Sequence, residues 1–272
     1  GVDIFFVISG YLISNIIVSE LNENKFSLLN FYNRRIRRIL PALFSTLALS
    51  IPFSYILLTP KAISEYARSL LSSVFFYSNY YFENLDFYNS EPTKLMPLLH
   101  TWSLAIEEQF YLIFPLLCIV LFKLNKNFFF IFLTLIAFSS VMLNSTTSGV
   151  IKFYEIQFRA WELILGSIVM ILRDSIKIRH IEKLGIFFIF FSILYFDDST
   201  LSINSIEPKL IACIGVALVL LSKNNLSIEK LSDFKFIYWV GLSSYSLYLL
   251  HQPIFSYVRI ANIKYSFLSD AY

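Results

Sequence analysis

Residues 98–117, LLHTWSLAIEEQFYLIFPLL, decide the fold of this chain. The stretch has the length of one membrane span, roughly 20 residues, yet it holds His100, Glu107 and Glu108. An ionised carboxylate at membrane depth costs roughly 2.5–3.5 kcal/mol on insertion scales. Helical spacing puts His100, Glu107 and Tyr111 on one face, where an imidazole and a carboxylate can hold or pass a proton. We expect an apolar helix with a functional polar face; the alternative is that these groups pair with arginines and only fix helix packing.

The composition is that of an integral membrane protein. The 272 residues are 57% hydrophobic and 15% charged, whereas soluble domains are nearer a quarter charged. The formal net charge of +3 is small, so the basic residues are better explained as topology signals than as a nucleic-acid interface. Cys118 and Cys213 each lie in an apolar run and are expected to be buried thiols, not a disulfide or metal pair.

Apolar runs separated by short polar loops recur along the whole sequence. We therefore expect an all-α, polytopic transmembrane helical bundle that forms a single domain over residues 1–272. Both ends of the sequence have the character of a truncated chain, because GVDIFFVISG begins inside an apolar helix. About eight spans of suitable length are expected, near residues 2–19, 40–59, 104–123, 127–143, 156–172, 184–196, 208–222 and 237–258.

Basic loops indicate the orientation, because cytoplasmic loops carry an excess of lysine and arginine. The strongest signal is the predicted loop at residues 33–38, with four arginines. The acidic loops at 83–91 and 197–207 are expected outside. Two weaker basic loops hold Arg173, Lys177, Arg179 and Lys183, and Lys223, Lys230 and Lys235.

All three basic loops fall on one side only if the apolar stretch at residues 69–82 does not cross the membrane. We therefore expect this stretch to be re-entrant or interfacial. It contains Ser72, Ser73, Ser78 and Asn79, and polar or irregular backbone at membrane depth must be covered by protein.

The four arginines of the first basic loop are Arg34, Arg35, Arg37 and Arg38. One interpretation is that they only orient the protein and contact anionic lipid. The other is a phosphate clamp, because arginine forks bind phosphate oxygens bidentately and a cytoplasmic substrate such as coenzyme A carries several phosphates. Both interpretations stay open, and they are compatible.

A second motif is FRAWELILG at residues 158–166. Arg159 and Glu162 are three residues apart on one predicted helix and can form an ion pair. The alternative is that Arg159 faces the same cavity as Glu107 or Glu108. Gly166 would admit a close neighbouring helix.

Two further motifs place polar residues in apolar helices. Ser244, Tyr248 and His251 fall on one helical face, which indicates contact with protein or water and, most simply, interhelical hydrogen bonds. Asp3 suits the positive end of a helix dipole. Ser9-Gly10 would allow close packing against a helix that precedes this chain.

Five stretches together resemble the membrane-bound acyltransferase family 3, in the family's order and over nearly the whole chain. They are GVDIFFVISGYLI, FYNRRIRRILPAL, LLHTWSLAIEEQFYLIFPL, FRAWELILG and GLSSYSLYLLHQPI. Members of this family move acyl groups, often acetyl, onto hydroxyls of cell-surface glycans. The segment HTWSLAIEEQFY is similar to members that acylate lipopolysaccharide O-antigen, exopolysaccharide or peptidoglycan, some of which carry a further SGNH-type domain.

The resemblance implies a multi-pass acyltransferase of the bacterial inner membrane, with acyl-CoA, most simply acetyl-CoA, as donor substrate and no bound cofactor or metal. It implies that a surface or lipid-linked glycan is the acceptor. Glu107 or Glu108 would orient the catalytic base, and His100 matches another family position. Arg159 would line the cavity and steady an oxyanion. The CoA phosphates would meet Arg34, Arg35, Arg37 and Arg38.

The family's catalytic histidine lies in a first helix that would precede Gly1, eleven residues after an arginine, so no residue of this chain inherits its role. An inactive fragment is therefore one alternative. Another is a proton-coupled transporter, because carboxylates and arginines at the membrane midplane also suit ion coupling. The sequence has no Walker-type glycine loop, HExxH motif or GxSxG elbow, which argues against a soluble nucleotidase or hydrolase.

Overall fold

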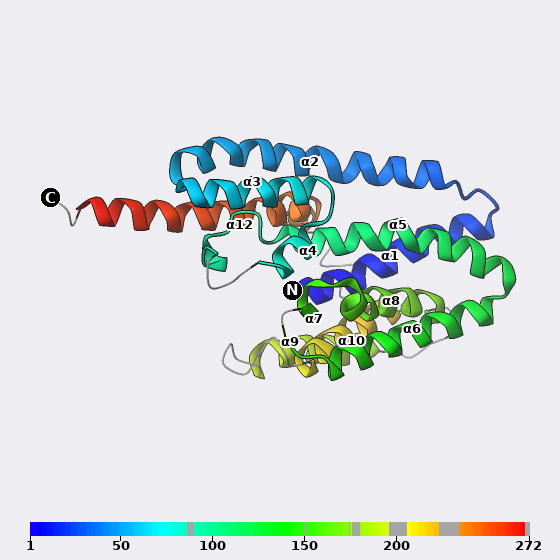
Figure 1. The fold of residues 1–272 in the computed structure, drawn as a ribbon. Helices are drawn as coiled ribbons and strands as arrows, with labels where there is room; N and C mark the ends of the chain where they lie inside the picture. The colour runs from blue at the N-terminus through cyan, green and yellow to red at the C-terminus, as the bar shows by residue number, and fades with distance from the viewer. Residues whose placement is uncertain are drawn as a thin grey trace. The chain divides into compact units, whose positions relative to one another are not determined.

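The computed structural model describes residues 1–85, 90–149, 151–173, 175, 180–195, 206–222 and 234–269. Within these ranges the chain is all-α, with helices α1 to α10 and α12 and a 3-10 helix η1, and no strand (Figure 1). This confirms the all-α part of the predicted fold class. Several residues of the predicted topology loops lie outside the described ranges: Asp86, Lys177, Arg179, Asp197, Asp198, Lys223 and Lys230.

The helices form two compact units. The first unit comprises Gly1–Phe26 and Glu107–Lys230, and the second comprises Ser27–Ile106 and Leu231–Tyr272. Helix α5 (Thr101–Leu124) belongs to both, because the division falls between Ile106 and Glu107.

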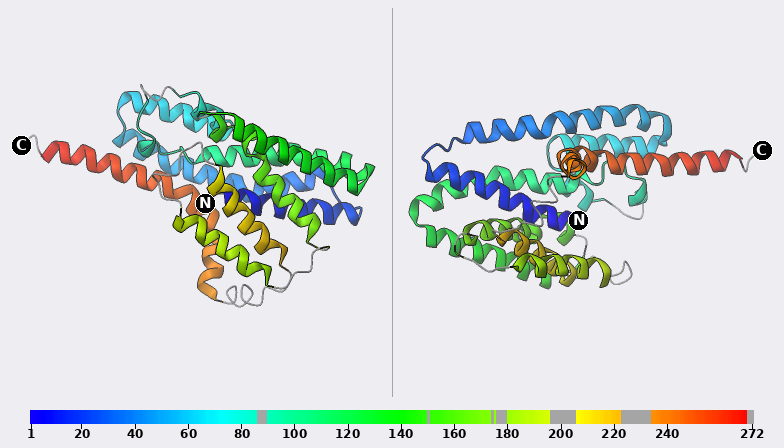
Figure 2. Two further views of the ribbon diagram at one scale, coloured as in Figure 1. Left: turned by 90° about the horizontal axis from the view of Figure 1, so that it is seen from below. Right: turned by 180° about the vertical axis from the view of Figure 1, so that it is seen from behind.

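The first unit is built around the contact between α1 and α8. Helix α8 also packs on α6, and α9 packs on α10 (Figure 2). The helices of this unit are α1 (Val2–Asn22), the larger part of α5, α6 (Lys126–Thr146), α7 (Ile151–Tyr154), α8 (Ile156–Leu172), α9 (Ile181–Tyr195) and α10 (Glu207–Leu221).

Two glycines allow the backbones of α1 and α8 to touch. A Cβ atom on Gly10 would lie 1.8 Å from the carbonyl oxygen of Leu163, and one on Gly166 would lie 2.0 Å from that of Val7. Close helix approach in membranes depends on such small residues, because packing replaces the hydrophobic effect as the driving force. The prediction for Gly166 is confirmed. The prediction that Gly10 packs against a helix preceding the chain is wrong, since its close neighbour is α8.

The second unit is held together by hydroxyl groups between apolar helices. The Tyr257 hydroxyl lies 2.6 Å from Ser54 Oγ and donates to the Ser50 carbonyl at 2.9 Å. Ser50 Oγ in turn lies 2.5 Å from the Tyr66 hydroxyl. These bonds join α2 (Leu28–Leu57), α3 (Pro60–Val74) and α12 (Lys235–Ser269), and the unit also contains α4 (Ser78–Glu83) and η1 (Thr93–Leu95).

The prediction that residues 33–38 form a loop is wrong, because α2 begins at Leu28. The side chain of Ser27 caps the helix by accepting a hydrogen bond from the Asn30 backbone N–H. A serine cap followed by leucine and arginine, which are good helix formers, starts the helix well before its apolar part. The arginines therefore lie on a helix, with three of their side chains exposed.

The stretch at residues 69–82 comprises the end of α3, a turn and most of α4. Phe76, with φ 52°, adopts the left-handed conformation that ends many helices. The Tyr77 N–H bonds the Ser72 carbonyl at 2.8 Å, which closes the end of α3. The four polar residues of the stretch are buried, as predicted: Ser72, Ser73, Ser78 and Asn79. That the stretch does not cross the membrane stays a prediction.

Among the described residues, four helices are long and apolar enough to cross a membrane, and they mark a membrane protein. They are Val2–Asn22, Leu28–Leu57, Thr101–Leu121 and Asn127–Thr146. The other four predicted spans are also helices, namely α8, α9, α10 and α12, which lie within a few residues of their predicted starts. Helix α12 ends at Ser269 rather than near residue 258. The count of eight spans stays a prediction.

The glycine contact predicts a specific sensitivity to added side-chain volume. Gly10→Ala should lower the free energy of unfolding by about 1–3 kcal/mol, because overpacking forces the two backbones apart. The matched control is Gly241→Ala, since no atom lies within 4 Å of a Cβ there. It should be neutral or stabilising by up to about 1 kcal/mol. Thermal unfolding midpoints in detergent at one heating rate provide the measurement, and equal midpoints would contradict the contact.

Candidate functional site

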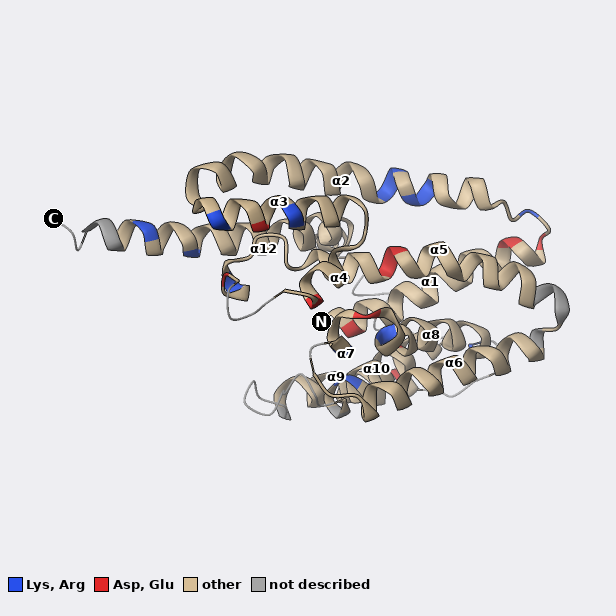
Figure 3. Cartoon of the chain, in the orientation of Figure 1, with Lys and Arg blue, Asp and Glu red and all other residues tan. Residues whose placement is uncertain are grey.

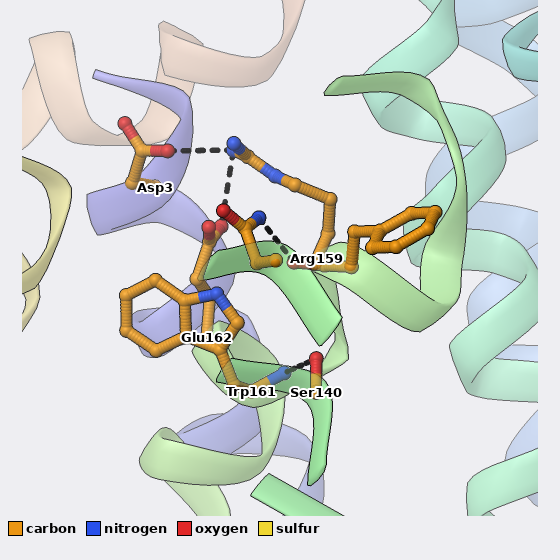
Figure 4. A network of polar contacts seen from close by, with 7 residues as sticks. Asp3, Ser140, Arg159, Trp161 and Glu162 are labelled. Atoms are coloured by element: carbon orange, nitrogen blue, oxygen red, sulfur yellow. Dashed lines mark hydrogen bonds and ion pairs between the residues drawn. The ribbon is translucent and has the colours of Figure 1, made fainter. Parts of the chain in front are cut away.

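The first unit contains a buried ion network centred on Arg159 of α8 (Figure 4). The guanidinium Nη2 lies 2.6 Å from Asp3 Oδ1 and 3.1 Å from Glu162 Oε2. The side chains of Arg159 and Glu162 are 1% and 0% exposed, and that of Asp3 is 21% exposed. The predicted ion pair between Arg159 and Glu162 is confirmed, and Asp3 is a second partner that the sequence did not reveal.

Aromatic rings and a second cation surround this network. The Arg159 guanidinium carbon lies 5.6 Å from the ring centre of Phe6 and 5.8 Å from that of Phe153. The Lys209 ammonium lies 5.9 Å from the ring centre of Phe153 and attracts both carboxylates electrostatically. Cations therefore accompany the two carboxylates, as buried charges require.

The start of α8 is fixed by side chains from α6. Ser140 Oγ donates to the Gln157 carbonyl at 2.7 Å and accepts from the Trp161 backbone N–H at 3.2 Å. Asn144 Nδ2 donates to the Phe158 carbonyl at 2.9 Å. These bonds hold the helical turn that carries Arg159, so the position of the guanidinium is determined by backbone contacts as well as by its own ion pairs.

A second buried network surrounds Glu107 of α5. The hydroxyls of Ser9 and Tyr111 both donate to its Oε1 atom, and they bond each other at 3.1 Å. The Glu107 side chain is buried at 3% exposed. Tyr111 lies one helical turn after Glu107, so the predicted shared face of these two residues is confirmed. Glu108 is half-buried one position further along the helix.

The two networks are both anchored on α1, through Asp3 and Ser9. Six residues separate these anchors, which is about 9 Å along a helix axis. Arg159 pairs with Glu162 and Asp3, and Glu107 accepts from Ser9 and Tyr111. That Arg159 faces the same cavity as Glu107 or Glu108 stays a prediction. The two networks lie at different depths of one helix.

His100 belongs to the second unit and not to a helix, which corrects the prediction that one apolar helix carries it. It lies in the turn that precedes α5 at Thr101. Its ring centre is 5.4 Å from those of both Tyr248 and His251 of α12. The Tyr248 hydroxyl donates to the His100 carbonyl at 2.9 Å and also bonds Ser103.

The predicted polar face of α12 makes an interhelical hydrogen bond at Tyr248, whose hydroxyl bonds Ser103 of α5. His251 Nδ1 instead bonds the Tyr248 carbonyl of its own helix. Tyr245, which was not part of the predicted face, donates from its hydroxyl to the Ile39 carbonyl of α2 at 3.2 Å. Ser243 and Ser244 instead donate to carbonyls of their own helix. Tyrosine reaches a neighbouring helix, whereas the short serine side chain bonds locally.

The arginines of α2 form a compact basic band near the start of that helix (Figure 3). Arg34, Arg37 and Arg38 are exposed, and helical spacing puts these three on one face. Arg35 is half-buried, with its guanidinium carbon 5.7 Å from the ring centre of Phe31. The exposed three can contact several phosphate oxygens at once.

The family model described as an acyltransferase domain matches residues 1–269. This chain belongs to the acyltransferase 3 family. The resemblance seen in the sequence is therefore confirmed over nearly its whole length.

Proteins of several bacteria are similar to this chain over most of its length. The O-acetyltransferase OatA of Staphylococcus aureus is 30% identical over 95% of this chain and 46% of its own length. The peptidoglycan O-acetyltransferase OatA of Listeria monocytogenes is 30% identical over 93% and 44%. The chain thus spans about half the length of these relatives. An uncharacterized protein of Haemophilus influenzae is 31% identical over 82% of this chain and 99% of its own length. No solved structure matches.

The Arg159 network predicts a large stability effect from a single substitution. Arg159→Gln should lower the free energy of unfolding by about 3–5 kcal/mol, because it leaves two carboxylates with an uncompensated buried charge. Lys25→Gln is the control, since it removes one partner of an exposed ion pair at 2.9 Å and should cost at most about 1 kcal/mol. Thermal unfolding midpoints measure both, and a shift for Arg159→Gln no larger than the control would refute the network's importance.

Proposed function

We propose that this chain is the membrane part of an O-acetyltransferase that transfers an acetyl group from acetyl-CoA to a hydroxyl of a cell-surface polysaccharide. The supporting observation is that an acyltransferase family model matches residues 1–269, together with relatives named O-acetyltransferase over 93–95% of the chain. One relative is named a peptidoglycan O-acetyltransferase, so peptidoglycan is one candidate acceptor. Lipopolysaccharide O-antigen and exopolysaccharide are the other acceptors consistent with the resemblance.

The reaction needs a proton acceptor and a site for negative charge. The sugar hydroxyl attacks the thioester carbonyl and gives up its proton, an ester C–O bond forms, and the C–S bond breaks so that CoA leaves as a thiol. A base assists the attack, and donors stabilise the oxyanion. The resemblance implies a histidine as the base.

Glu107 is the first candidate to orient or recharge such a base. Its Oε1 atom accepts hydrogen bonds from the hydroxyls of Ser9 and Tyr111, which hold the carboxylate in one orientation. Glu108 is the neighbouring candidate, and His100, packed against His251, is a candidate for holding or passing a proton. Arg159 carries the positive charge that would stabilise an oxyanion. An oxyanion there would compete with Asp3 and Glu162 for the same guanidinium.

The phosphates of acetyl-CoA would meet the basic band of α2. Nineteen residues separate Arg38 from Leu57, the end of α2, which is about 29 Å along the helix. This equals the thickness of the hydrocarbon core, about 30 Å. The band would therefore lie at the inner edge of the bacterial inner membrane and the end of α2 at its outer edge, by the positive-inside rule.

Lysine substitutions separate the two interpretations of the arginines. The triple variant Arg34→Lys, Arg37→Lys, Arg38→Lys keeps the positive charge that orients the protein but loses the bidentate forks. We expect its KM for acetyl-CoA to rise about tenfold, the effect of losing roughly 1.4 kcal/mol of binding. Initial rates with radiolabelled acetyl-CoA and membranes holding the complete enzyme provide the measurement.

The matched variant carries glutamine at the same three positions and should impair both insertion and donor binding. If the lysine variant has an unchanged KM while the glutamine variant inserts poorly, the arginines serve topology alone. The same assay distinguishes a transferase from a transporter, because only a transferase leaves the label on the glycan.

Glu107→Gln tests the role of the buried carboxylate. The amide oxygen can still accept the hydroxyl bonds of Ser9 and Tyr111, so the fold should be kept while the charge is lost. We expect the rate of acetyl transfer to fall by about tenfold to a hundredfold. General acid–base catalysis contributes about 10²–10⁴-fold, and a base that is no longer oriented by a carboxylate loses part of that contribution.

Glu108→Gln is the parallel variant, and Glu23→Gln, at an exposed ion pair, is the control that should keep the wild-type rate. Transfer rates are compared at equal amounts of membrane-inserted protein. Wild-type rates for both the Glu107 and Glu108 variants would remove these residues from the mechanism.

A further inference from the structure

The second unit has a hollow of about 640 Å³ that none of the preceding roles uses. It lies along α3, α4 and the residues that follow them, all within one unit. Its lining is polar and aromatic, unlike the apolar walls expected of a surface that only contacts lipid tails. The lining residues are Lys61, Glu65, Arg68, Tyr77, Tyr80, Tyr81, Asn84, Leu85 and Ser90.

Tyrosine rings form one part of the lining. Tyr77 and Tyr80 stack with ring centres 5.2 Å apart and planes inclined by 29°. Tyr77 is exposed, and its ring offers a flat apolar surface. Tyr81 is held in place by a hydrogen bond from its hydroxyl to the Glu65 carbonyl at 3.0 Å. Burial, together with the nearby Glu65 carboxylate, raises the pKa of Tyr81, so its hydroxyl stays neutral.

Charged and amide groups form the other part. Lys61, Glu65 and Arg68 are spaced by four and three residues, so they lie on one face of α3, and all three line the hollow. The Glu65 carboxylate also accepts from the Glu91 backbone N–H at 3.4 Å. Asn84 adds an amide, which donates one N–H to the Tyr80 carbonyl at 2.8 Å and also has a second N–H and an acceptor oxygen. The hollow therefore combines donors, acceptors and ring faces.

The hollow begins near the end of α2 that is remote from the arginines, at Lys61. α3 begins at Pro60, two residues beyond Leu58, which caps α2. With the basic band at the inner membrane edge, this end of α2 is at the outer edge. Glycans outside the cell would reach the protein from this side, whereas acetyl-CoA is cytoplasmic.

We propose that this hollow is the subsite that binds the acceptor saccharide. A pyranose ring has C–H faces that pack on aromatic rings and hydroxyl edges that both donate and accept hydrogen bonds. Tyr77 and Tyr80 supply the ring faces, and Lys61, Glu65, Arg68 and Asn84 supply the polar partners. This inference rests on the proposed function, because it names the substrate class bound at the outer side of that reaction.

The chemistry favours a sugar over an anionic lipid. A lipid phosphate would be bound by clustered cations, yet Glu65 lies between Lys61 and Arg68 on α3. Lipid tails would fit the neighbouring apolar cavity of about 480 Å³, which is lined mainly by Leu57, Leu58, Leu95, Ile260 and Ile263. The polar hollow is a different surface, lined by charged, amide and tyrosine side chains.

Saccharide binding can be measured without catalysis. The probes are soluble tetramers of β-1,4-linked N-acetylglucosamine and of β-1,4-linked glucose, titrated into the complete protein in lipid nanodiscs and followed by saturation-transfer NMR. We expect at least one tetramer to bind the wild type. The double variant Tyr77→Ala, Tyr80→Ala should weaken that binding about tenfold, and Arg68→Gln should weaken it less.

The matched controls change tyrosines without removing the ring surface of the hollow. Tyr77→Phe keeps the ring and should bind within twofold of wild type. Tyr55→Ala removes an 81% exposed ring of α2 that does not line the hollow and should also bind normally. Circular dichroism and elution volume establish that each variant is folded. The proposal is overturned if neither tetramer binds the wild type, or if the double variant binds as the wild type does.

Acetyl transfer from labelled acetyl-CoA distinguishes this inference from the proposed function. If the wild type transfers acetyl groups and the double tyrosine variant has an unchanged KM for the glycan, the hollow is not the acceptor subsite and the proposed function stands. If tetramers bind at the tyrosines but no glycan becomes labelled, the proposed function fails while the hollow remains a saccharide site.

Discussion

The backbone contact between α1 and α8 is the constraint on which the first unit depends. Gly10 and Gly166 each occupy the space where the other helix's backbone passes, so the two helices have one possible register. That register brings Asp3 to Arg159 near the helix starts. It also fixes the position of Ser9 on α1, and the Ser9 hydroxyl donates a hydrogen bond to Glu107. Charged groups that are costly in lipid are thereby held against partners on a rigid frame.

The sequence predicted those features that depend on spacing within one helix. The pair of Arg159 and Glu162 and the shared face of Glu107 and Tyr111 follow from steps of three and four residues. Their second partners could not be predicted, because Asp3 lies 156 residues from Arg159 and Ser9 lies 98 residues from Glu107. One local error, the loop assigned to residues 33–38, came from treating the apolar boundary as the helix boundary. The cap at Ser27 was the signal that could have corrected it.

The proposed chemistry is distributed over both units. The first unit holds the buried carboxylate and the arginine network, and the second holds the basic band, the histidine pair and the tyrosine-lined hollow. Helix α5 belongs to both units, because the boundary between the units falls inside it, directly before Glu107. Within the second unit, the arginines proposed to bind the donor lie near the start of α2, and the hollow proposed to bind the acceptor begins near its end. Such a separation suits a reaction whose two substrates come from opposite sides of a membrane.

The ion pair between Asp3 and Arg159 also has a consequence for how the protein is made. The ribosome must add 156 residues after Asp3 before its partner exists, which takes roughly 8–30 s at typical bacterial synthesis rates of about 5–20 residues per second. During that interval α1 has a carboxylate with no guanidinium to neutralise it, and it also lacks the helix against which its glycine fits. An insertion machinery that retains early helices until later ones emerge would spare α1 this exposure to lipid.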